Sequence, residues 1–129
     1  MQLRFFLAGA AGLATLAAPE AMAKTYLCLP EVATALDQQE NGTFSANVVD
    51  LSQFKFILTN ESGRWLLKKS GTDGAIFDDC DTEYFCENSL GWAGAFYRLE
   101  GSKKFTIVFS WQKEQVYSLI TAGGSCTEL

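Results

Sequence analysis

The side chains that could do chemistry are concentrated in one stretch of the chain, residues 77–87. This stretch holds five of the fifteen acidic residues, two of the four cysteines and three aromatic rings. Carboxylates at this density could hold a hard cation such as calcium, or could dock on a basic protein with help from the rings. The candidate partner-binding residues are Asp78, Asp79, Asp81, Glu83, Tyr84 and Phe85.

Calcium is the metal ion that this acidic stretch would suit best. Asp79, Asp81 and Glu83 alternate, so an extended strand would point all three carboxylates to one side. A calcium loop, however, needs Gly at its sixth position and Glu at its twelfth. Counted from Asp79, those positions hold Tyr84 and Leu90. The loop pattern is not met, and we expect a hydrated acidic turn with no metal and no cofactor.

Catalysis is not expected for this chain. It contains no histidine, which excludes Ser-His-Asp and Cys-His arrangements. Gly123 and Gly124 precede a cysteine rather than a helix, so they do not form a phosphate-binding loop. The net charge of −5 disfavours nucleic acid and anionic membrane surfaces, which both require a basic footprint. We therefore expect a protein that binds and is not an enzyme.

The first 23 residues have the pattern of a cleaved signal peptide. Arg4 gives a positive start, residues 5–18 form an apolar run, and Ala21-Met22-Ala23 is a small-x-small cleavage site after Pro19. The run is shorter than the roughly 20 apolar residues of a membrane span. The sequence thus predicts export to the periplasm or the exterior, with residues 24–129 forming a single domain and no membrane span.

Four cysteines in an exported chain of this size predict two disulfides. Three pairings are possible, and we favour Cys80–Cys86 with Cys28–Cys126. The first pair flanks a turn, and the second would tie the two ends of the mature domain together. Counting inward from Cys80 and Cys86, Asp81 would face Phe85 across a three-residue loop.

The elements that position these residues are predicted to be short antiparallel strands. Turn signals recur about every 8–12 residues, which indicates an all-β barrel or sandwich of about seven to eight short strands. Pro30 is expected to end the first strand. Apolar side chains alternate most clearly in two strands, and the positions expected to face the core are Phe54, Phe56, Leu58, Phe105, Ile107, Phe109 and Trp111.

Two functions from different classes are compatible with this outline. The first is docking on a protein partner through the acidic and aromatic loop, whose charge would suit a basic partner. In layout, as an exported β domain tied by disulfides, the chain resembles periplasmic inhibitors of lysozyme, although no functional residue carries over from that likeness. The alternative is a carrier for a small apolar ligand, because a closed barrel of about eight strands can enclose one. Residues 91–99 and 104–112, which carry apolar side chains on both faces, motivate that alternative.

Overall fold

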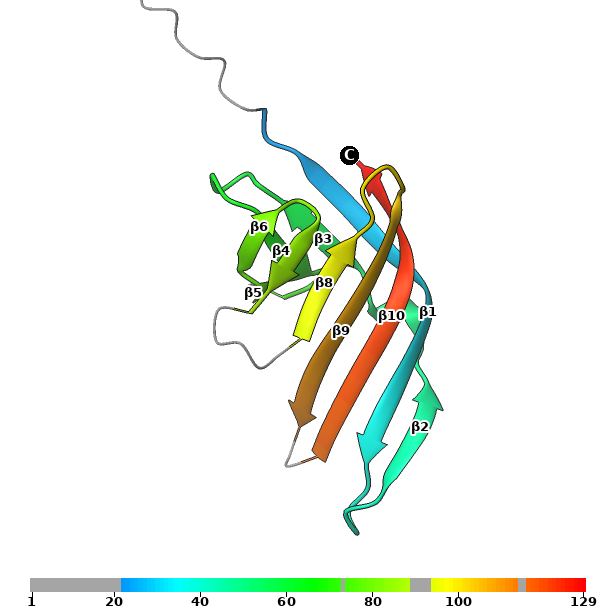
Figure 1. Ribbon diagram of the computed structural model, residues 1–129. Coiled ribbons are helices and arrows are strands. Elements are labelled where there is room, and N and C mark those ends of the chain that lie inside the picture. Colours follow the sequence, from blue (N-terminus) through cyan, green and yellow to red (C-terminus); the bar gives the residue numbers. More distant parts are fainter. Residues whose placement is uncertain (1–21, 73, 89–93, 114–115) are drawn as a thin grey trace, which may run out of the picture.

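The computed structural model describes residues 22–72, 74–88, 94–113 and 116–129, and most of the predicted signal peptide therefore lies outside the described residues. The described part is built from β-strands and one short 3-10 helix (Figure 1). In chain order these are β1 (Thr25–Gln38), β2 (Phe44–Val48), η1 (Leu51–Gln53), β3 (Phe56–Thr59), β4 (Leu66–Lys69), β5 (Ala75–Phe77), β6 (Asp79–Thr82), β7 (Phe85–Glu87), β8 (Gly94–Arg98), β9 (Lys104–Lys113) and β10 (Val116–Glu128). The described residues include no helix long and apolar enough to cross a membrane.

The strands form one antiparallel sheet that curls into a nearly closed barrel. Its order is β5-β4-β3-β1-β10-β9-β8-β7-β6, and β2 pairs with β1 outside this path. The two edge strands, β5 and β6, are separated in the chain by Asp78 alone, so the edges meet. Across this seam, the Asn88 amide donates to the Ile76 carbonyl at 3.4 Å. The all-β prediction is confirmed, and the arrangement is a barrel rather than a sandwich.

Phenylalanine rings from facing strands pack inside the barrel. Phe56 contacts Phe105 and Phe109 with ring centroids 6.2 and 6.0 Å apart, and Phe96 stacks on Phe105 at 5.6 Å. The predicted core positions in these strands are buried, and the side chain of Trp111 lies outside the described residues. Residues 91–93 lie outside them as well. The alternation of the sequence thus predicted the inward face, because side chains alternate across a strand.

The predicted end of the first strand at Pro30 is wrong, because β1 continues to Gln38. The pairing of β1 with β10 shifts between Pro30 and Val32, which marks a bulge. Glu31 is the residue left without a facing partner, and this local interruption of the ladder accommodates the neighbouring proline, which has no N–H to donate. Gly124 faces Pro30, and a Cβ atom there would lie 2.0 Å from the Leu29 carbonyl oxygen. Gly124 of β10 therefore allows β1 and β10 to approach each other closely at this point.

Both predicted disulfides are present. Cys28 and Cys126 face each other across β1 and β10, with Cα atoms 3.9 Å apart. Cys80 and Cys86 face each other across β6 and β7, with Cα atoms 4.0 Å apart. These bonds account for all four cysteines and fit an oxidising compartment.

Candidate functional site

The hairpin of β6 and β7 differs by one residue from the predicted pairing. Thr82, not Asp81, faces Phe85, because the register shifts between Cys80 and Thr82 and leaves Asp81 as the bulged residue. The backbone N–H of Tyr84 donates to the Thr82 hydroxyl at 3.1 Å and closes the tight turn. A bulge inserts one unpaired residue and redirects the side chains that follow it. The expected row of carboxylates on one side of a regular strand is therefore interrupted.

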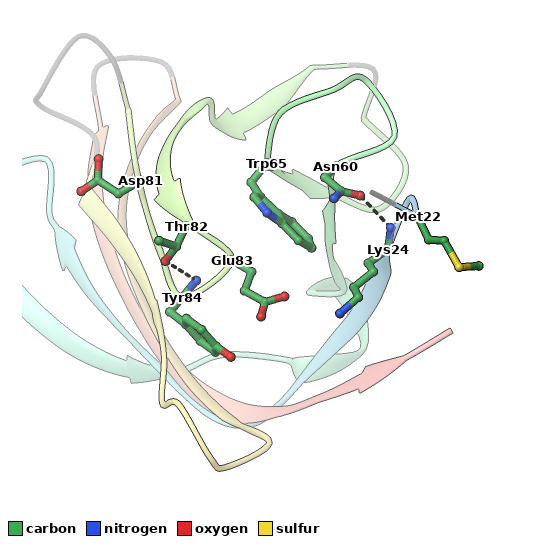
Figure 2. Close-up of a pocket in the computed structure, with 8 residues that line it drawn as sticks. All are labelled: Met22, Lys24, Asn60, Trp65, Asp81, Thr82, Glu83 and Tyr84. Carbon is green, nitrogen blue, oxygen red and sulfur yellow. Dashed lines mark hydrogen bonds between the residues drawn. The ribbon is translucent and has the colours of Figure 1, made fainter. Parts of the chain in front are cut away.

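This hairpin tip lines an open cleft of about 560 Å³ at one end of the barrel (Figure 2). The tip faces the turn between β3 and β4, which supplies Asn60 and Trp65, and the segment that precedes β1. The backbone N–H of Lys24 donates to the Asn60 side-chain oxygen at 2.6 Å, which fixes that segment beside the turn. The full lining consists of Met22, Lys24, Asn60, Trp65, Asp81, Thr82, Glu83 and Tyr84.

The structure brings together only part of the predicted site. Asp81, Glu83 and Tyr84 line the cleft, and Figure 2 shows the Asp81 carboxylate at its margin, turned away from Trp65. The other three predicted residues lie elsewhere. Asp78 joins β5 to β6, Asp79 is exposed opposite Glu87, and Phe85 packs on Tyr97 with centroids 6.2 Å apart.

Glu83 is the centre of a polar network beneath the cleft. Its carboxylate accepts a hydrogen bond from the Tyr26 hydroxyl at 3.1 Å and pairs with Arg98 at 3.4 Å. The Arg98 side chain is 8% exposed, so its charge needs a partner that is available inside the protein. Glu83, at 21% exposure, supplies that charge while still reaching solvent. The network therefore holds the hairpin tip against the barrel wall.

Two aromatic rings lie close to the buried guanidinium. The Arg98 Cζ atom lies 4.0 Å from the centroid of Tyr26 and 4.8 Å from that of Tyr84. Trp65 continues the row, with its ring 6.0 Å from Tyr26. Stacking of this kind is a favourable environment for a guanidinium, whose planar group is weakly hydrated. Rings and one cation thus form a continuous wall behind Glu83.

Tyr84 lines both the main cleft and a second one of about 290 Å³, which Arg98 and Lys103 also line. A hydrogen bond with the Glu83 carboxylate, more than burial, raises the pKa of the Tyr84 hydroxyl. The backbone N–H of Arg98 donates to the Tyr84 carbonyl at 2.8 Å. Side chain and backbone of Tyr84 are therefore both held in place between the two clefts.

The sequence reasoning missed Trp65, Asn60 and Lys24 as cleft residues. Trp65 alternates with Leu67, a pattern that indicates the core face of a strand, but its ring lies at the end of the barrel and is partly exposed. The signal available in the sequence was the position of Trp65, two residues after the turn at residues 60–63. Tryptophan is large and is rarely buried completely, so its ring at the end of a strand can reach the surface.

No known family model, curated protein or solved structure matches this chain. Among the described residues, no three Asp, Glu or Cys side chains come together in a way that could hold a metal ion. The function must therefore be argued from the geometry of the cleft.

Proposed function

We propose that this chain is a small exported binding domain, without catalytic activity, that docks on a basic protein partner through the end of the barrel. The cleft between the β6–β7 hairpin tip and Trp65 would receive a lysine or arginine side chain of the partner. One observation carries the proposal: residues 81–84, tethered by the Cys80–Cys86 disulfide, line an open cleft opposite an aromatic ring.

The chemistry of the cleft suits a cation. Glu83 places a carboxylate between the rings of Trp65 and Tyr84 (Figure 2), and ring faces attract ammonium and guanidinium groups. Lys24 of the chain itself lines the same cleft (Figure 2), so a cationic side chain of the partner would bind beside it or displace it. Asp81 at the margin and a net charge of −5 would steer a basic partner towards the site.

The cleft is also preorganised for binding. The short disulfide and the bonds from Glu83 to Tyr26 and Arg98 hold the hairpin tip in one shape. A surface that is ordered before binding loses less conformational entropy when a partner arrives. Export, which the signal pattern and the two disulfides support, would place the domain among secreted or periplasmic partners.

The first experiment measures the binding of a short arginine- and lysine-rich peptide by isothermal titration calorimetry. Trp65→Ala should weaken binding by about tenfold or more, because it removes one aromatic wall. Tyr117→Ala is the matched control, since it removes an exposed ring from β10 outside the cleft. Equal affinities for these two variants would rule out the cleft as the binding site.

Charge gives a second, independent comparison on the same hairpin. Asp81→Lys reverses a charge that lines the cleft, and Asp79→Lys makes the same change in an exposed residue that does not line it. We expect the Asp81 variant to lose more affinity than the Asp79 variant. If both variants bind as the unmodified chain does, electrostatic docking at the hairpin tip is wrong.

The apolar carrier remains an untested alternative. Described interior positions such as Phe56, Phe96 and Phe105 fill the space between the strands with rings that touch one another. This packing gives the carrier function no support, and we do not propose it.

A further inference from the structure

The second strand has an open edge. Among the described residues β2 pairs only with β1, and Figure 1 places it on the outside of β1, beyond the main order of the barrel. An unpaired strand edge presents a row of backbone donors and acceptors that another strand can use. Proteins usually protect such an edge with charged residues or proline. The sequence of β2, Phe-Ser-Ala-Asn-Val, contains neither.

The backbone groups that face this open edge can be identified. The N–H of Gln39 donates to the Thr43 carbonyl at 2.6 Å, and the N–H of Val49 donates to the Ala33 carbonyl at 3.3 Å. In an antiparallel pair the bonded residues recur every second position, so odd-numbered residues of this segment point their backbone groups at β1. The N–H and C=O groups of Phe44, Ala46 and Val48 therefore point away from β1.

The side chains of the same three residues are self-complementary. A second β2 strand in antiparallel orientation, centred on Ala46, would set Phe44 of each copy opposite Val48 of the other. Both are strongly exposed, at 60% and 88%. Leu36 faces Ala46 on one side and Leu119 on the other, and both leucines are exposed. The pairing would therefore place the Leu36 and Leu119 pair of each copy on either side of the two Ala46 residues at the dimer axis. No charged residue of β2 opposes this pairing, although the whole chain is acidic.

We propose that two copies of this chain form a symmetric dimer by antiparallel pairing of their β2 strands about Ala46. A two-fold axis presents the same patch from both copies, which is the arrangement that a self-complementary edge allows. A second copy is favoured over an extended segment of another protein for three reasons. Under the two-fold axis the outward-facing backbone groups of the two strands are in register, and Phe44 of each copy meets Val48 of the other. No charged residues of the two β2 strands face each other. The dimer does not depend on the cleft, which lies on other strands.

Crosslinking tests the register directly. All four native cysteines are in disulfides, so Ala46→Cys introduces the only thiol of the chain. Facing residues of a bonded antiparallel pair have Cα atoms about 5.5 Å apart, within the range for a disulfide. Mild oxidation should convert this variant rapidly to a covalent dimer. Val108→Cys, on the outer face of β9, is the matched control and should crosslink slowly.

Sedimentation equilibrium tests the association itself. The unmodified chain should be dimeric, and Ala46→Pro should be monomeric, because proline removes an N–H that points to the open edge but none that bonds β1. Val48→Lys should also abolish the dimer. Because Val48 is 88% exposed in the monomer, this substitution should leave the fold intact, so it tests the dimer even if the proline variant misfolds. A monomeric unmodified chain, a dimer that survives both substitutions, or equal crosslinking at positions 46 and 108 would overturn the proposal.

Discussion

The two disulfides join facing residues in two very different strand pairs. Cys28–Cys126 lies between strands of fourteen and thirteen residues and closes a sequence separation of 98. Cys80–Cys86 lies between strands of four and three residues and closes a separation of 6. The first bond reinforces a pair that already has many backbone bonds. The second holds a hairpin that is too short to be stable alone.

This contrast separates the stability of the fold from the shape of the candidate site. A bond that closes a long loop removes much more entropy from the unfolded chain than a bond that closes a short one. The long disulfide should therefore dominate the free energy of unfolding. The short disulfide should dominate the geometry of the cleft, because it lies next to the bulge at Asp81 and the turn at Glu83.

The largest effect is expected from removing the long disulfide. Cys28→Ala with Cys126→Ala should lower the free energy of unfolding by about 4–5 kcal/mol by the loop-entropy relation. Urea unfolding followed by tryptophan fluorescence measures this. A loss no larger than that from removing the short disulfide would contradict the comparison.

Removing the short disulfide should reduce the stability of the fold less than removing the long one, but should reduce the affinity of the cleft more. Cys80→Ala with Cys86→Ala should lower the free energy of unfolding by about 2 kcal/mol. The affinity for the basic peptide should fall by about tenfold, since the hairpin tip loses its fixed shape. The two quantities are measured by urea unfolding and calorimetry on the same preparation. Unchanged peptide affinity would show that the short disulfide does not shape the cleft.

The third effect concerns the network under the cleft. Glu83→Gln should lower the free energy of unfolding by about 1–2 kcal/mol, because the buried Arg98 guanidinium loses its charge partner. Glu87→Gln is the control on the same hairpin: it is exposed, and its change should stay within about 0.5 kcal/mol. Equal thermal stabilities of the two variants would argue against a structural role for the Glu83–Arg98 pair.

The smallest effect is a pH dependence. The hydrogen bond with Glu83 raises the pKa of Tyr84 above its ordinary value of 10.0. Because the folded value is the higher one, the stability from this bond is present below pH 10 and is lost as the pH rises through the folded pKa. Ultraviolet titration of the unmodified chain should show a tyrosine transition above pH 10 that belongs to Tyr84. Glu83→Gln should remove that late transition, and its persistence would refute the assignment.

Much of the fold was predictable because it rests on local patterns. Alternation identified the buried faces that carry Phe56 and Phe105, and cysteine positions identified both disulfides. The path through Pro30 was not predictable. It depends on a bulge and on Gly124, 94 positions later in the chain, which leaves room for the Leu29 carbonyl. Proline and glycine signal interruption locally, and only the paired strand reveals that the interruption is tolerated.

The candidate site was predictable only in part. The density of acids and rings located the hairpin tip, and Asp81, Glu83 and Tyr84 do line the cleft. The bulge set Asp79 apart from them, and a bulge leaves no mark in residue spacing. Arg98 was missed because a buried cation is recognised by its partners, and these come from two distant parts of the chain, Tyr26 in β1 and Glu83 and Tyr84 in the turn between β6 and β7.

The central claim is that the cleft at the end of the barrel recognises cationic side chains. The most direct measurement is the change in backbone and indole NMR signals when the basic peptide is titrated into the unmodified chain. We predict saturable shifts at Asn60, at the Trp65 indole and at residues 81–84, with little change in β2. Shifts spread over other surfaces, or no saturable shift at Trp65, would contradict the account.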